Sequence, residues 1–92
     1  MGKATVLIVE DDPDIVEMLE YNLQDEGYDT ISALNGEDCV DLATGRLPDL
    51  VILDIMLPKL DGFEVCRTLK NRTATAGIPI IILSAKSQET DK

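Results

Sequence analysis

The chain has 92 residues, enough for one small domain, and 45% of them are hydrophobic, a fraction typical of globular proteins. A formal net charge of −10 disfavours contact with nucleic acid. Because the sequence contains no long apolar run, we expect no membrane span and no secretory leader. Histidine is absent, which excludes Ser-His-Asp and Cys-His nucleophile systems and zinc sites with imidazole ligands.

The charge is unevenly distributed. Residues 1–49 contain 13 acidic residues and two basic ones, Lys3 and Arg46, whereas residues 50–92 contain 5 acidic and 6 basic residues. Most of the acidic side chains are expected to form a solvated surface. Cys39 and Cys66 fall within helical patterns and are expected to be small buried apolar residues. Two such thiols without a signal peptide favour a reducing, cytoplasmic location.

The first predicted element is a buried strand, Thr5–Val9, formed by a β-branched and apolar run. Three carboxylates follow it directly, in the run Glu10-Asp11-Asp12. A helix is predicted to start there, with Asp12 as N-cap and Pro13 at the first helical position, where its missing N–H is not needed. Gly27 is expected just past the end of this helix.

Residues 28–33 alternate weakly and predict a short second strand near the edge of the sheet. After a turn at Asn35-Gly36, residues 37–45 predict a short helix. Four apolar residues, 50–53, then run into Asp54, and Pro58 prevents the strand from continuing. An uninterrupted apolar run of this kind is typical of a strand buried on both faces of a parallel sheet.

Residues 59–62 predict a turn, and a third helix starts at Phe63 and closes with cationic residues at 70 and 72. Residues 73–77 are expected to be a polar connector, and residues 78–83 a fourth strand with Pro79 near its start. Strands and helices therefore alternate, which predicts an α/β fold with a doubly wound parallel sheet. No linker divides residues 1–92, so we expect a single domain.

Asp54 is predicted at the carboxyl end of a central strand, where open α/β sheets place their ligands. Taken alone, it is also explained as the cap of the following turn. The acids after the first strand could converge on the same rim, and such a cluster needs a compensating cation. Because the candidate ligands are all oxygens, Mg²⁺ is the expected ion. Asp54 could then act as a nucleophile toward a phosphoryl group, and Ser84 ends the fourth strand at the same rim.

Three motifs together resemble the response regulator receiver domain of two-component signalling. They are the acidic run that ends at Asp12, the run Asp54-Ile55-Met56-Leu57-Pro58 with Asp61-Gly62, and the strand end Ser84-Ala85. They occur in the order and at spacings similar to those of the family, and the resemblance covers essentially all 92 residues. It implies a flavodoxin-like fold with strand order 2-1-3-4.

The resemblance also implies roles for individual residues. Asp54 becomes the phosphoacceptor, and the metal ligands become Asp11, Glu10 acting mostly through water, Asp54 and the carbonyl of Met56. The acidic pair could be Glu10-Asp11 or Asp11-Asp12, and we choose the former because Asp12 is already engaged as an N-cap. Ser84 and Ala85 would bind the phosphoryl group, with Ser84 as the switch hydroxyl.

One departure from the family pattern is expected to matter. A full receiver continues through a fourth helix, a fifth strand that bears a Lys, and a fifth helix. The sequence stops before these elements, so we interpret residues 1–92 as a single partial receiver domain, truncated after the fourth strand. The fourth strand would then be an open edge, and we expect self-association or element swapping through it.

The leading hypothesis is a phosphoacceptor signalling domain, not a turnover enzyme, that takes a phosphoryl group from a partner histidine kinase onto Asp54 in a Mg²⁺-dependent reaction. The alternative is a non-catalytic scaffold or self-associating fragment of the same fold. A nucleotide binder is disfavoured because no glycine-rich loop follows the first strand. The wording of the Asp54 motif also resembles receivers attached to winged-helix DNA-binding domains, which is a hint about a parent protein and implies no nucleic-acid contact by this chain.

Overall fold

The computed structural model describes residues 3–54 and 62–83, with Asp54, Gly62 and Phe63 described by their backbone alone. Strands and helices alternate in the order β1 (Thr5–Val9), α1 (Pro13–Asp25), β2 (Asp29–Ala33), α2 (Gly36–Arg46), β3 (Leu50–Asp54), α3 (Gly62–Asn71) and β4 (Ile80–Leu83). This order confirms the predicted alternation. No helix in the described part is long and apolar enough to span a bilayer.

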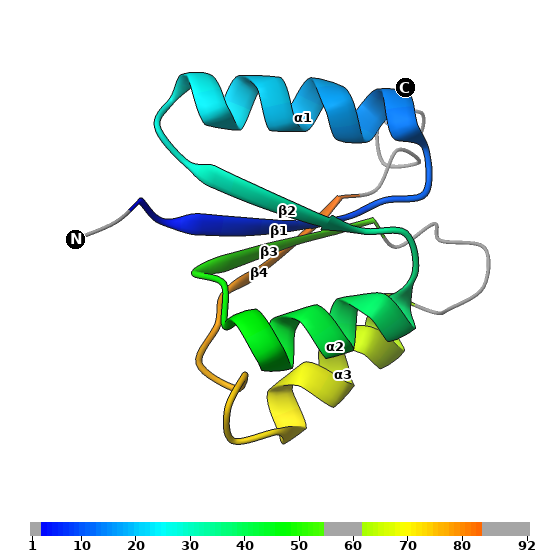
Figure 1. Cartoon of the computed structure of the whole chain (residues 1–92). Coiled ribbons are helices and arrows are strands. Elements are labelled where there is room, and N and C mark those ends of the chain that lie inside the picture. The colour runs from blue at the N-terminus through cyan, green and yellow to red at the C-terminus, as the bar shows by residue number, and fades with distance from the viewer. Residues whose placement is uncertain (1–2, 55–61, 84–92) are drawn as a thin grey trace, which may run out of the picture.

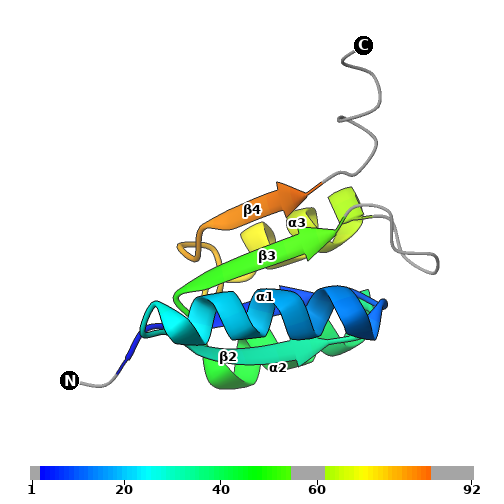
Figure 2. The same ribbon diagram turned by 90° about the horizontal axis from the view of Figure 1, so that it is seen from above.

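All four strands are parallel and form one sheet in the order β2-β1-β3-β4, which confirms the predicted 2-1-3-4 order. β1 lies in the interior, where Val9 pairs with Ala33 of β2 on one side and with Leu53 of β3 on the other. Figures 1 and 2 show α1 over one face of the sheet and both α2 and α3 over the opposite face. Of the described strands, β2 and β4 are therefore the edges.

The main hydrophobic core lies between the sheet and the pair α2 and α3. Alternate residues of β1 and β3 point to one face of a sheet, and here they meet buried side chains from both helices. The cluster contains Leu7, Val9, Ala33, Cys39, Ala43, Val51, Leu53, Val65 and Leu69. Burying one Leu or Val side chain contributes roughly 1.5–3 kcal/mol, so this face supplies much of the driving force for folding.

Helix α1 begins and ends where its sequence signals predict. Asp12 is extended (φ −91°, ψ 111°) and its Oδ1 accepts the N–H of Asp14 at 2.9 Å, with Pro13 as the first helical residue. At the other end Gly27 adopts φ +99°, a left-handed conformation that costs glycine little. No residue of α1 is fully buried, so this helix covers its face of the sheet only loosely.

β2 begins one residue later than predicted, and α2 is longer than predicted by one residue at each end. Asn35 is the N-cap of α2, since Asn35 Oδ1 accepts the N–H of Asp38 at 2.9 Å. Its C-cap, Leu47, is left-handed at φ 48°, and the Leu47 N–H donates to the carbonyl of Ala43 at 3.0 Å. The helix is therefore stopped by local hydrogen bonding without a glycine.

The connector between α3 and β4 differs from the expected polar loop. Thr75 is fully buried, and its hydroxyl donates to the carbonyl of Leu69 at 2.6 Å. The Lys70 ammonium group, in the last turn of α3 as predicted, donates to the carbonyls of Ala76 and Ile78 at 3.2 and 3.1 Å. β4 begins two residues later than predicted, because the N–H of Ile78 is used within the connector turn.

Candidate functional site

The register of the sheet brings Glu10 and the backbone of Asp54, two of the predicted site residues, to one edge. Val9 is the last residue of β1 and pairs with Leu53. Glu10 therefore follows β1 directly and Asp54 is the last residue of β3, at the carboxyl ends of neighbouring strands. Asp54 itself pairs with Leu83, the last residue of β4. Segments 44 residues apart in the sequence thus meet at a single rim, as the buried character of both strands predicts.

Glu10 is held at the rim by hydrogen bonds to its neighbours. Its N–H donates to the carbonyl of Ala33 at 3.0 Å, which extends the β1–β2 ladder by one residue. Its Oε2 accepts the N–H of Asp12 at 3.1 Å, and only 5% of the residue is exposed. A buried carboxylate is costly unless hydrogen bonds compensate its desolvation, so Glu10 has a fixed position and a fixed orientation.

The two acids that follow Glu10 differ in whether their side chains cap α1. Asp12 uses one carboxylate oxygen as the N-cap of α1, and its carbonyl accepts the N–H groups of Ile15 and Val16. Asp11 is exposed and lies between the buried Glu10 and this cap. The predicted N-cap role of Asp12 is confirmed, and Asp11 is left as the acid of the three that faces solvent without capping the helix.

The remaining predicted site residues lie outside the described part of the chain. This applies to Met56, Ser84 and Ala85 entirely, and to the side chain of Asp54. Among the described residues, no group of three or more Asp, Glu, Cys or His side chains is arranged to hold a metal ion. The donor chemistry at the rim nevertheless fits Mg²⁺, since Glu10 and Asp11 offer carboxylate oxygens and no thiolate or imidazole belongs to the rim.

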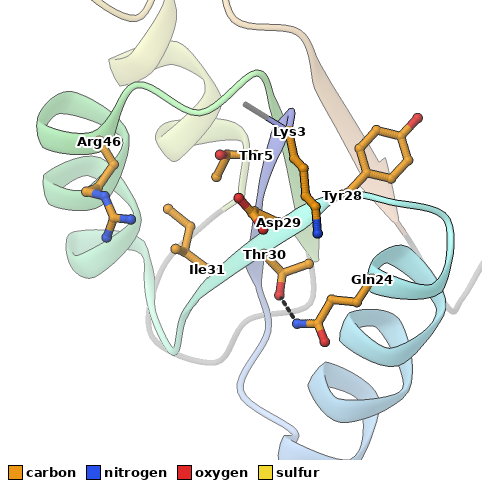
Figure 3. A pocket seen from close by; sticks show the side chains of 8 residues that line it. All are labelled: Lys3, Thr5, Gln24, Tyr28, Asp29, Thr30, Ile31 and Arg46. Carbon is orange, nitrogen blue, oxygen red and sulfur yellow. Dashed lines mark hydrogen bonds between the residues drawn. The ribbon is translucent and has the colours of Figure 1, made fainter. Parts of the chain in front are cut away.

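The surface pockets of the described part include two that lie away from every predicted site residue. One, of about 390 Å³, runs between α2 and α3 along Val40 and Val65. The other, of about 400 Å³, lies at the amino ends of β1 and β2, opposite the rim, and Figure 3 shows the eight side chains that line it. Two of these side chains are Lys3 and Arg46, the only basic residues among the first 49. The sequence shows both residues but does not predict that they line one pocket.

Comparison with known proteins gives a consistent result. The family model of the response regulator receiver domain matches residues 6–92. The alkaline phosphatase synthesis transcriptional regulatory protein PhoP of Bacillus subtilis is 47% identical over 87 residues, which is 95% of this chain. The match covers 35% of PhoP, so the chain spans about a third of the length of that relative.

Solved structures agree with the sequence comparison. A putative response regulator from Chloroflexus aurantiacus is 36% identical with a TM-score of 0.84, covering 88% of this chain and 66% of that one. The chemotaxis response regulator CheY4 of Vibrio cholerae is 28% identical with a TM-score of 0.88, covering 99% of this chain and 76% of that one. The four described strands and three helices thus have the arrangement found in these structures.

Proposed function

Because this chain belongs to the response regulator receiver domain family, we propose that Asp54 is a phosphoacceptor that receives a phosphoryl group from a partner histidine kinase with the aid of Mg²⁺. Receiver domains are signalling domains and not turnover enzymes, so the reaction would modify the chain itself. None of residues 1–92 is a histidine, so a phosphohistidine donor would lie outside these residues.

The observation that carries this proposal is the parallel register of β1 and β3. It places Glu10 and Asp54 directly after paired residues, on neighbouring strands of the sheet. Like charges about 4 Å apart repel by roughly 4 kcal/mol at an effective dielectric near 20. A bound cation would therefore stabilise an acidic rim of this kind. The rim also lies where open α/β sheets bind their ligands.

We assign the metal ligands to Asp11, Asp54, the carbonyl of Met56, and Glu10 acting through water. Bound there, Mg²⁺ would neutralise the negative charge that develops on the transferred phosphoryl group. Asp12 takes no direct part, because its carboxylate caps α1. The Ser84 hydroxyl and the Ala85 N–H would donate to the phosphoryl oxygens and report phosphorylation to the rest of the domain.

The wider context is part of the same proposal. The relative from Bacillus subtilis is a transcriptional regulatory protein about three times as long as the matched region. We infer that this receiver controls a DNA-binding parent without contacting nucleic acid itself, which its net charge of −10 disfavours. Its two free cysteines, Cys39 and Cys66, suit a reducing cytoplasm.

Acetyl phosphate provides a direct test. Its phosphoryl group would be transferred to a carboxylate oxygen of Asp54, forming an acyl phosphate and releasing acetate. We expect intact-mass spectrometry to detect one added phosphoryl group on the wild type with Mg²⁺ and none with EDTA. Asp54→Asn should abolish the modification. Asp41→Asn, which removes an exposed acid from α2, is the matched control and should be modified normally; modification of Asp54→Asn at the wild-type level would contradict the proposal.

A second candidate, self-association, is favoured by the exposure of β4. Three of its four residues are apolar and exposed, with Ile81 at 48%, Ile82 at 37% and Leu83 at 39%. β4 is also an edge among the described strands, and exposed edges with apolar side chains tend to pair with other chains. Figure 2 shows that α1 lies over β1 and β2, away from β4.

Sedimentation velocity over a concentration series tests this second candidate. We expect the weight-average sedimentation coefficient to rise with concentration in the wild type. Ile81→Lys, which places a charge on the edge strand, should keep the chain monomeric, while Leu34→Lys, at an exposed leucine outside the strands, should behave like the wild type. A wild type that stays monomeric at all concentrations would rule out association through β4.

A further inference from the structure

The pocket at the amino ends of β1 and β2 combines two cations from distant parts of the chain. Lys3 precedes β1 and Arg46 is the last residue of α2, and they are the two basic residues of the first 49. Both line the same pocket of about 400 Å³, a size within the range of small-molecule sites. Of the 13 acids in those 49 residues, the lining includes Asp29 alone.

Neither cation is neutralised by an ion pair in the described part of the chain. Within residues 3–54 and 62–83 the one ion pair joins Arg67 and Glu64 on α3. The acid nearest in sequence to Arg46, Asp49, is engaged elsewhere, since its Oδ2 accepts the N–H of Thr5 at 2.8 Å. The lining therefore has two cations and one carboxylate, Asp29, so it carries a net positive charge in a chain whose net charge is −10.

The rest of the lining includes one hydroxyl, that of Thr30, which can donate a hydrogen bond near Lys3. In Figure 3 Lys3 extends along β2 toward Thr30 and Gln24, while Arg46 lies on the other side of Asp29 and Ile31. Gln24 Nε2 donates to Thr30 Oγ1 at 2.8 Å, the dashed line in Figure 3, which leaves the Thr30 hydroxyl hydrogen free to donate. Thr5 and Tyr28 also belong to the lining, although Figure 3 shows the Tyr28 hydroxyl pointing away from Lys3 and Arg46.

We propose that this pocket binds a small ligand with two phosphate-like groups, one held by Arg46 and the other by Lys3. The planar guanidinium group of arginine suits bidentate contact with phosphate oxygens, and the lysine ammonium group binds phosphate as a point charge. Asp29 opposes the anion and limits its affinity. The site is at the end of the sheet opposite Glu10 and Asp54, about 15 Å away along a five-residue strand, so it is independent of the proposed phosphoacceptor.

Titration with inorganic pyrophosphate, followed by ¹H–¹⁵N correlation spectra, tests the proposal. Mg²⁺ is omitted so that the ligand does not engage the acidic rim, and about 0.15 M NaCl screens diffuse attraction. We expect saturable shifts at the amides of Thr5, Thr30 and Ile31. Asp54→Asn should bind pyrophosphate as the wild type does, which separates this result from the outcome for the proposed function.

Four variants identify the groups responsible. Lys3→Gln and Arg46→Gln should each weaken binding by about tenfold, the effect of losing one charge-assisted hydrogen bond. Asp29→Asn should tighten it by removing repulsion. Arg67→Gln, which makes the same change of charge on α3, should leave the affinity within about twofold of the wild type. Thermal unfolding by circular dichroism checks that each variant is folded.

Three results would overturn the proposal. The first is the absence of saturable shifts up to about 10 mM pyrophosphate, a concentration that detects even millimolar binding. The second is an equal loss of affinity in Arg67→Gln and Lys3→Gln, which would reveal a diffuse response to net charge. The third is weaker binding by Asp29→Asn, which would mean that the pocket does not repel anions through Asp29.

Discussion

Cys39 is buried within the core, and this burial raises the pKa of its thiol to about 12 from an ordinary value of 9.0. The folded chain therefore keeps the proton at pH values where the unfolded chain releases it. The associated stability is fully present below pH 9 and is lost as the pH rises toward 12.

We therefore expect the free energy of unfolding of the wild type to fall by about 1 kcal/mol more than that of Cys39→Ala between pH 9 and pH 10. Urea denaturation at both pH values measures this difference, and subtracting the variant removes the contributions of Lys and Tyr titration. Cys66→Ala, at a half-buried thiol, serves as the control. Equal pH dependence in Cys39→Ala and the wild type would contradict the assignment.

Leu47 is the one non-glycine residue of the described part with a positive φ, at 48°, and 54% of it is exposed. A leucine in the left-handed region is strained by roughly 1–2 kcal/mol, whereas asparagine tolerates this region better. Leu47→Asn is therefore expected to raise the free energy of unfolding by roughly 0.5 kcal/mol, measured by urea denaturation.

The matched control for this substitution is Leu34→Asn. Leu34 is similarly exposed, at 59%, but does not have a positive φ. We expect no stabilisation there, because asparagine relieves no strain. If the two variants changed stability alike, the gain at Leu47 would reflect a general benefit of replacing an exposed leucine, and not its backbone conformation.

At the scale of elements, the connector from α3 to β4 depends on the buried hydroxyl of Thr75. Thr75→Val keeps the shape of the side chain but removes the donor to the carbonyl of Leu69. We expect it to cost about 1 kcal/mol of unfolding free energy, whereas Thr75→Ser should retain the hydrogen bond. Urea denaturation of the three proteins compares these effects; if Thr75→Val were as stable as the wild type, the hydroxyl would be dispensable.

The same connector shows where sequence reasoning reaches its limit. Strands β1 and β3 and the start of α1 match their predictions, because apolar runs and the Asp12-Pro13 cap are strong local signals. Thr75 is different: a threonine among polar neighbours favours a surface loop, and only its packing against α3 makes it buried. Local pattern cannot supply that contact, since the α3–β4 turn is set by tertiary hydrogen bonds.

The surface features of the molecule also include one that could be predicted from the sequence and one that could not. The rim could be predicted, because residues that follow buried parallel strands must meet at one edge, and the structure confirms the register of β1 and β3. The pocket lined by Lys3 and Arg46 could not, because these residues belong to one lining only through the placement of α2 beside the amino ends of β1 and β2. Basic residues that distant in the chain carry no spacing signal.

At the scale of the whole molecule, repulsion among the acidic side chains of residues 1–49 destabilises the folded state. Residues 1–49 carry 13 acids against two bases, and repulsion among surface charges is screened by salt. Raising NaCl from about 0.02 to 0.2 M should therefore raise the free energy of unfolding, by roughly 0.5–1 kcal/mol. Urea denaturation at the two salt concentrations measures the change.

A variant with fewer charges provides the comparison. Glu17→Gln combined with Asp41→Asn removes two exposed carboxylates from α1 and α2, and its stability should depend less steeply on salt. If added salt instead lowered the stability of the wild type, attractive ion pairs would dominate its surface, contrary to the single pair seen in the described residues.

The interior position of β1 determines how the protein responds to trimming. Peripheral segments usually tolerate proteolysis, but β1 lies between β2 and β3 in the sheet. Cleavage between Thr5 and Leu7 would remove the hydrogen bonds that Thr5 makes with Asp49 and would disrupt the sheet at an interior strand. Degradation from this side should therefore be all-or-none, without a stable shortened product.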